Sequence, residues 1–223
     1  MGFRVNADQI KTNYTDTLSR FTADLKYEDI PAEVRERAKF IAMQTVGVGL
    51  ATKGTPIADR SVALGKFTGG AVSEGGATLW TTGCKSSVVG AAFCNSTLAD
   101  ALDWEDCSWT GHPSASIIPV AFAVAEAEHK SGKDYITAIV AAYEVYQRIA
   151  MAVQPPENWP NYKGWGLTSW QIFAGVIPAA KLYGLNAEQV NQAIGFGATN
   201  CTIPGQLHHI TMSDAYHYEH GYR

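Results

Sequence analysis

The hydrophobic residues of this chain recur at intervals of three and four positions, the spacing that places side chains on one face of an α-helix. Strict alternation, the mark of a half-buried strand, is almost absent, and 77–80 is the one short extended segment that the pattern predicts. The sequence therefore predicts an all-α bundle of about eight helices in a single domain over residues 1–223. The predicted helices are 7–27, 31–50, 55–69, 86–102, 116–128, 133–151, 168–183 and 186–198.

Two of these helices are expected at the centre of the bundle. Residues 90–101 are rich in glycine, alanine and serine, and residues 117–127 form a nearly unbroken apolar run. A helix at the surface of a globular protein needs a polar face, so both stretches are typical of buried helices.

Individual residues mark local features of the predicted helices. Gly47 and Gly49 are poor helix formers inside the second helix, and we expect them where another helix approaches closely. Asn186, followed three residues later by Gln189, predicts a capping box at the start of the last predicted helix.

Composition excludes several classes of protein. Hydrophobic residues make up 46% of the chain and charged residues 17%, which leaves ample material for a core. The formal net charge of −4 gives no basic footprint for nucleic acid, and no segment approaches the ~18 uncharged apolar residues of a membrane span. The N-terminus has no apolar signal-peptide region and the four cysteines form no CxxC pair, so we expect a cytoplasmic protein with free thiols.

The densest candidate chemistry lies at 99–116, between two apolar helices. This junction holds four carboxylates, two tryptophans, a cysteine and His112. A histidine beside a carboxylate is held in one tautomer and acts as an acid or base near neutral pH, which makes Asp103 and His112 candidates for proton transfer. The structural alternative is that Asp103 caps the end of a helix and His112 begins a turn.

Two clusters raise the question of a metal site, and we expect none. Helical spacing places Asp103 and Asp106 on one face and Glu105 on another, and we interpret Glu105 and Asp106 as structural. A histidine cluster near the end of the chain has no cysteine or acidic partner at a familiar zinc spacing. Its members are expected in the polar wall of a cleft, or as ordinary surface residues. They are His208, His209, His217 and His220.

Several segments together resemble the MmgE/PrpD family, and the resemblance covers nearly the whole chain. It is most specific between residues 91 and 115. The segments are Ala-Thr-Leu-Trp at 77–80, Ala-Ala-Phe-Cys-Asn-Ser-Thr-Leu-Ala-Asp-Ala-Leu-Asp-Trp-Glu-Asp at 91–106, Gly-His-Pro-Ser-Ala at 111–115, Ala-Ile-Val-Ala-Ala-Tyr-Glu at 138–144 and Ala-Ala-Lys-Leu-Tyr-Gly-Leu-Asn-Ala-Glu-Gln at 179–189.

The resemblance implies a fold, a reaction class and a cofactor requirement. The family order is an N-terminal helical domain, a smaller α/β lid domain and a return to the helical domain. We therefore expect this chain, at about half the family's usual length, to hold the helical domain and to lack the lid. Family activities are 2-methylcitrate dehydration, cis-aconitate decarboxylation and iminodisuccinate epimerisation, all without a metal or organic cofactor.

The resemblance also implies which residues form the pocket. Asp103 matches the family's pocket aspartate and His112 matches its HPS histidine. This chain departs from the family at three positions: Cys107 stands for a threonine, Gly166 for a histidine and Tyr216 for a substrate-binding lysine. Because Cys107 follows a pair of carboxylates, which raise the pKa of a thiol, we expect a poor nucleophile there.

The resulting hypothesis is a cofactor-independent lyase (dehydratase or decarboxylase) or isomerase that abstracts a proton from a small (poly)carboxylate. His112 would be the acid or base, either oriented by Asp103 or acting across from it. A homodimer is expected, with a second chain as one source of the lid. The alternative is a non-catalytic or split-enzyme helical subunit that needs a partner chain. Tyr216 and His217 complete the predicted catalytic set, and the predicted substrate-binding residues are Cys107, Lys163, His208 and His209.

Overall fold

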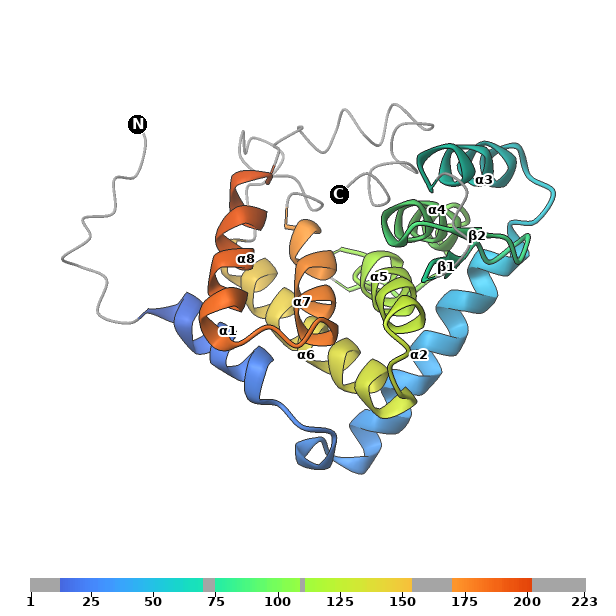
Figure 1. The fold of residues 1–223 in the computed structure, drawn as a ribbon. Helices are drawn as coiled ribbons and strands as arrows, with labels where there is room; N and C mark the ends of the chain where they lie inside the picture. Colours follow the sequence, from blue (N-terminus) through green and yellow to red (C-terminus); the bar gives the residue numbers. More distant parts are fainter. Residues whose placement is uncertain (1–12, 70–74, 109–110, 154–169, 202–223) are drawn as a thin grey trace, which may run out of the picture.

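Helices dominate the part of the chain that the computed structural model describes, which is residues 13–69, 75–108, 111–153 and 170–201 (Figure 1). The all-α prediction is confirmed. The helices are α1 (Tyr14–Asp24), a short 3₁₀ helix η2 (Tyr27–Asp29), α2 (Ala32–Ala51), α3 (Pro56–Gly69), α4 (Val88–Asp100), α5 (Ser114–Ala127), α6 (Gly132–Val153), α7 (Ile172–Leu182) and α8 (Ala187–Thr199); the strands are β1 (Ala77–Thr78) and β2 (Lys85–Ser86).

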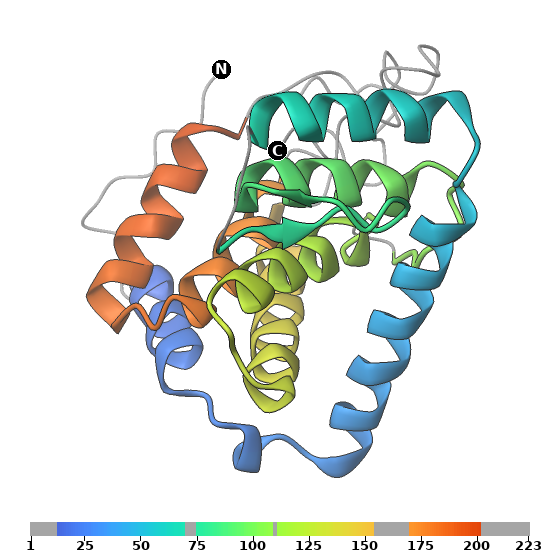
Figure 2. The ribbon, with the colours of Figure 1, turned by 45° about the vertical axis from the view of Figure 1, so that its right-hand side comes forward.

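Helix α5 is the centre of the bundle, as its apolar run predicts. It packs against α4, α6, α7 and α2, and 10 of its 14 residues are buried. Figure 2 shows α3, α4 and α5 stacked one upon the next. The many small side chains of α4 allow this close stacking, and nine of the 13 residues of α4 are buried. On the other side of the bundle, α1 packs against α8.

The first half of the extended segment predicted at 77–80 is strand β1, which pairs antiparallel with β2, a strand that the pattern does not predict. Residues of α4 and α5 hold this two-stranded sheet. Thr78 pairs with Lys85, and its backbone N–H donates to Glu126 Oε2 at 2.7 Å. Lys85 also pairs with Glu126, and Asn95 of α4 donates to the Thr78 carbonyl at 2.8 Å. The sheet is therefore a small hairpin attached to α4 and α5 rather than a separate layer of the fold.

The start of α8 and the end of α4 can be compared with the positions predicted from sequence. The capping box at Asn186 and Gln189 is confirmed, with both reciprocal hydrogen bonds at 3.0 Å. By contrast, α4 ends at Asp100 and does not reach 102. Asp103 follows in the left-handed region with φ of 54°, and its N–H donates to the Asp100 carbonyl at 2.9 Å. The prediction that helical spacing places Asp103 and Asp106 on one face is therefore wrong.

The two glycines of α2 differ in their surroundings. A Cβ atom on Gly49 would lie 2.7 Å from Trp80 Cε3, whereas a Cβ on Gly47 would meet nothing within 4 Å among the described residues. Close approach is therefore confirmed for Gly49, although the neighbour is the Trp80 ring as well as α4. For Gly47 the prediction is not confirmed, since no described helix approaches it.

Alanine at these two positions is expected to change stability in opposite directions. Gly49→Ala should lower the free energy of unfolding by about 1–3 kcal/mol, because the new methyl group overlaps the Trp80 ring. Gly47→Ala should raise it by up to about 1 kcal/mol through helix propensity alone. Urea denaturation followed by circular dichroism measures both, and equal changes in the two variants would contradict the assigned contact.

Among the described residues, no helix has the length and apolar character needed to cross a membrane.

Candidate active site

The connection between α4 and α5 folds back on itself and brings carboxylates to a histidine. Ser108 and Gly111 exchange backbone hydrogen bonds of 2.9 and 3.0 Å, which form an isolated antiparallel bridge. Because the bridge is antiparallel, the chain reverses direction there, and residues before Ser108 lie beside residues after Gly111. His112 is thereby placed against the carboxylates that follow α4.

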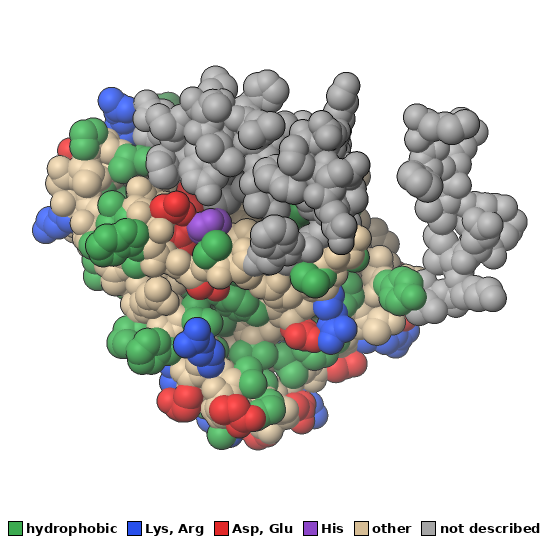
Figure 3. Space-filling model, turned by 180° about the vertical axis from the view of Figure 1, so that it is seen from behind, with side chains coloured by type: hydrophobic (Ala, Val, Ile, Leu, Met, Phe, Trp, Pro, Cys, Tyr) green, Lys and Arg blue, Asp and Glu red, His purple; other side chains and the backbone are tan. Residues whose placement is uncertain are grey.

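His112 is bound by Glu105. The Nδ1 atom of His112 lies 2.7 Å from Glu105 Oε1 and 3.5 Å from Asp103 Oδ1. The Glu105 side chain has 0% of its surface exposed, whereas that of Asp103 has 53%. Figure 3 shows a histidine side chain among acidic side chains on one face of the molecule. The structure thus brings Asp103 and His112 together as predicted, but Glu105, interpreted from sequence as structural, makes the closer contact.

A second buried carboxylate, that of Asp100, lies close to Glu105 and His112. One ligand atom from each of Asp100, Glu105 and His112 lies within 4.8 Å of the others. These three are the described residues best placed to hold a cation. A metal bound by two protein ligands at about 2.0–2.2 Å keeps those ligand atoms roughly 3 Å or more apart. The 2.7 Å contact between Glu105 and His112 is therefore a hydrogen bond in geometry, and the expected absence of a metal stays a prediction.

The electrostatics of the cluster favour a protonated imidazole. Burial by itself lowers the pKa of His112, but the hydrogen bond and charge of Glu105, with Asp100 and Asp103, outweigh it and raise the pKa above its usual value. Burial raises the pKa of Glu105; the hydrogen bond from His112 opposes this change, and the charge of Asp100 adds to it. Both shifts therefore favour the protonated form, of the His112 ring and of the Glu105 carboxyl.

Asp106 fixes the start of α5, as the interpretation of this residue as structural predicts. Its Oδ1 accepts from the Ser114 N–H at 2.9 Å, and its Oδ2 accepts from the Tyr143 hydroxyl of α6 at 2.8 Å. A carboxylate at a helix N-terminus satisfies backbone donors that have no partner within the helix. Asp106 thus joins the connection, α5 and α6 at one point.

The backbone of His112 is also held from outside its own segment. Gln171, just before α7, donates from Nε2 to the His112 carbonyl at 2.8 Å and to Ser116 Oγ at 3.2 Å. The hydroxyl of Tyr146 in α6 donates to Gln171 Oε1 at 3.0 Å. Nothing in the sequence pattern marks Gln171 for this role, because its partners are 55 and 59 residues away.

Among the other predicted site residues, only Cys107 lies in the described part of the chain. Cys107 is exposed as a residue, but partial desolvation of its thiol, together with the charges of Asp103, Asp106 and Glu105, raises the pKa of the thiol. That direction agrees with the expectation of a poor nucleophile. The remaining predicted residues lie outside the described residues; they are Lys163, His208, His209, Tyr216 and His217.

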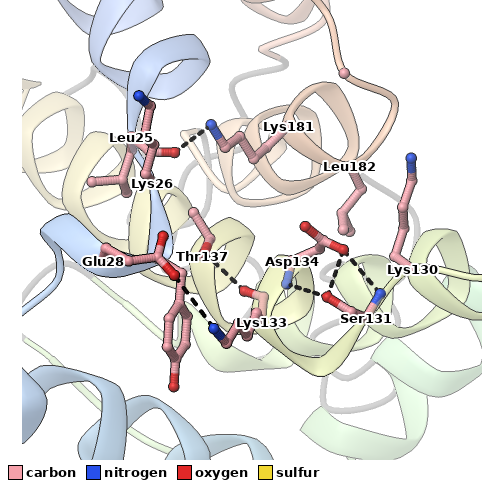
Figure 4. Close-up of a pocket in the computed structure, with 12 residues that line it drawn as sticks. Leu25, Lys26, Glu28, Lys130, Ser131, Lys133, Asp134, Thr137, Lys181 and Leu182 are labelled. Carbon is pink, nitrogen blue, oxygen red and sulfur yellow. Dashed lines mark hydrogen bonds and ion pairs between the residues drawn. The ribbon is translucent and has the colours of Figure 1, made fainter.

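A cavity of about 460 Å³ lies at the other end of the bundle (Figure 4). Lys181 Nζ donates to the carbonyl oxygens of Ala23 and Leu25, each at 2.7 Å, and Lys133 pairs with Glu28 at 3.3 Å. Through these contacts Lys181 links α7 to the end of α1, and Lys133 links α6 to η2. Its wall includes Lys130 and Ser131, in the turn that follows α5, whereas His112 and its carboxylates precede α5. The 14 residues of α5 span about 20 Å. The cavity is therefore separate from the candidate active site.

Comparison with known proteins decides the family. The sequence model of the MmgE/PrpD N-terminal domain matches residues 16–221. The chain belongs to the MmgE/PrpD family. The matched range includes the whole histidine and carboxylate cluster and every described helix except the first residues of α1.

Individual MmgE/PrpD relatives are more distant. The cis-aconitate decarboxylase-like protein oryM of Aspergillus oryzae is 27% identical over 207 residues, which cover 87% of this chain and 41% of that protein. The cis-aconitate decarboxylase of Aspergillus terreus is 25% identical over 197 residues, covering 85% of this chain and 39% of that protein. The chain thus spans about two fifths of the length of the curated relatives it matches.

Proposed function

We propose that this chain supplies the acid–base group of a lyase or isomerase that acts on a small (poly)carboxylate. The observation that supports the proposal most is the His112 ring, hydrogen-bonded at 2.7 Å to a buried carboxylate and 3.5 Å from the more exposed Asp103. Membership of the MmgE/PrpD family and relatives named cis-aconitate decarboxylase favour carboxylate chemistry over other uses of such a pair.

The chemistry proposed for His112 is proton transfer at carbon. With Nδ1–H donated to a carboxylate, Nε2 of the neutral ring accepts a proton from the carbon next to a substrate carboxylate. In elimination, that proton leaves carbon while the leaving group departs; in epimerisation, it returns to the opposite face. In decarboxylation, the bond to CO₂ breaks first and protonated His112 delivers its proton to the carbanion. The raised pKa of His112 favours this donor role, because more of the ring is protonated near neutral pH.

The developing negative charge on the substrate needs donors of its own. We assign this role to Lys163, His208, His209 and Cys107, and proton transfer at a second position to Tyr216 and His217. Asp103, half-exposed beside His112, is proposed to face the substrate side of the cluster. No metal or organic cofactor is required for a reaction of this kind.

We also propose a cytoplasmic homodimer. Phe40 and Met43 of α2 are more than half exposed, and Leu50, seven residues after Met43, is 46% exposed. At these spacings the three side chains lie along one side of the helix, which is typical of a helix with a packing partner. The described cysteines form no disulfide, which fits a reducing compartment.

The proposal is tested by incubating the 223-residue chain with a panel of small di- and tricarboxylates and following each by NMR. Loss of water, loss of CO₂ or inversion at carbon in any member of the panel is the expected result. No conversion by a folded chain, alone or with an added lid-domain chain of a relative, would contradict the proposal and favour a non-catalytic helical subunit.

A further inference from the structure

We propose that Glu105 is the positioning residue for His112: it accepts the Nδ1–H bond and thereby leaves Nε2 as the atom that exchanges protons with the substrate. This inference rests on the proposed acid–base role of His112. It assigns the orienting role to Glu105 in place of Asp103. Sequence alone favours Asp103 for that role.

The distances from His112 Nδ1 distinguish the roles of Glu105 and Asp103. A hydrogen bond between a nitrogen and an oxygen has its atoms about 2.7–3.2 Å apart and weakens steeply beyond that range. Glu105 Oε1 lies at 2.7 Å from Nδ1, inside this range, and Asp103 Oδ1 lies at 3.5 Å, outside it. Glu105 therefore makes the directional contact, whereas Asp103 acts on the ring through its charge.

Burial gives the second argument. A fully buried side chain has few alternative rotamers, whereas a half-exposed one exchanges its partner for water at little cost. The Glu105 side chain is 0% exposed, so the packing that encloses it also fixes the position of its carboxylate. Asp103 is 53% exposed and stands at a left-handed backbone position outside any helix. A group that must hold an imidazole ring still is better placed at Glu105.

Among the described residues, the contacts of the His112 backbone and of its ring come from different groups. Gln171 donates to the His112 carbonyl, and α5 begins two residues after His112, so both features anchor the backbone. The 2.7 Å contact with Glu105 acts on the ring itself. The carboxylates that act on the ring are Glu105, Asp103 and, from the end of α4, Asp100. Other titratable groups in the described part of this region have partners of their own: Asp106 and Tyr143 of α6 bond to each other, and Cys107 donates to the Ser108 carbonyl.

Nitrogen NMR of the folded chain tests this inference without any substrate. Histidine is labelled with ¹⁵N, and the His112 signals are assigned by their loss in His112→Gln. Above the pKa of the ring, the expected result is the tautomer with hydrogen on Nδ1. The opposite tautomer, with hydrogen on Nε2, would overturn the inference whatever the chain proves to catalyse.

Two matched substitutions distinguish the effect of Glu105 on His112 from that of Asp103. Glu105→Gln removes the charge but keeps the shape, and it should lower the pKa of His112 by about one unit or more, a tenfold change in proton affinity. Asp103→Asn should lower it by much less. Equal shifts, or a larger shift for Asp103→Asn, would overturn the inference. If Glu105→Gln does not fold, Glu105→Asp takes its place: it keeps the charge, but its shorter side chain withdraws the carboxylate from Nδ1 and weakens the hydrogen bond, so it should still lower the pKa of His112 more than Asp103→Asn does.

Kinetics extend the test once a substrate is known. Glu105→Gln should lower kcat with little change in KM and should move the pH midpoint of kcat in step with the NMR pKa. If the tautomer and pKa results hold but no carboxylate is turned over, the proposed function fails and the positioning role of Glu105 stands.

Discussion

Replacing His112 by glutamine is expected to lower turnover of the proposed carboxylate substrate by about 10²–10⁴-fold, the usual contribution of a general acid or base. Glutamine has a similar length and can still donate a hydrogen bond to Glu105, but it cannot exchange a proton near neutral pH. The loss should therefore appear in kcat rather than in KM. Initial rates at saturating and limiting substrate measure the two separately.

A second histidine provides the control for this experiment. His129, in the turn between α5 and α6, is exposed and adopts a left-handed φ of 50°, which asparagine tolerates well. His129→Asn should leave turnover unchanged. If His112→Gln retained more than about a tenth of the wild-type kcat, the acid–base role of His112 would be refuted.

Replacing Asp106 by alanine is expected to lower the free energy of unfolding by about 2–4 kcal/mol. The change removes the acceptor of the Ser114 N–H at the start of α5 and leaves the Tyr143 hydroxyl without its carboxylate partner. Helix capping contributes about 1 kcal/mol, and a buried polar group that loses its partner costs about 1–3 kcal/mol. Chemical denaturation of both proteins measures the difference.

The matched control is an exposed carboxylate with a surface partner. Glu36 pairs with Lys39 one helical turn away, and both side chains are at least half exposed. Exposed pairs of this kind contribute little to stability. Glu36→Ala should leave the denaturation midpoint nearly unchanged, and a similar loss in both variants would show that Asp106 does not hold the junction.

The helices were predictable from sequence because their signals are local. A three-and-four spacing of apolar residues, Ser87 ahead of α4 and the Asn186–Gln189 pair ahead of α8 act within one or two turns of chain. The central position of α5 was predictable for the same reason, since its apolar run leaves no polar face.

The partner of His112 was not predictable in the same way. The apolar pattern continues to Leu102, so sequence extends α4 past Asp100 and gives Asp103, Glu105 and Asp106 helical directions that they do not have. The helix instead ends at Asp100, and the Ser108–Gly111 bridge decides which carboxylate meets the ring. Glu105 follows Asp103 by two residues, and in a non-helical connection residues two apart can share a side; that spacing is the signal that sequence offered.

Long-range contacts explain the other differences. A Cβ on Gly49 would meet the Trp80 ring, whereas a Cβ on Gly47 would have no described atom within 4 Å, although both glycines stand in one helix two residues apart. Gln171 supports His112 from 59 residues away. No local pattern distinguishes such positions, because the neighbour is set by how the helices stack.

Proton exchange in heavy water tests the central claim most directly. In D₂O, the wild-type chain should exchange the hydrogen on the carbon next to a substrate or product carboxylate. The pH midpoint of this exchange should match the pKa of His112 measured by NMR, and His112→Gln should abolish the exchange. Exchange that persists in His112→Gln, or a midpoint more than about one unit from the His112 pKa, would contradict the assignment of His112 as the proton-transferring group.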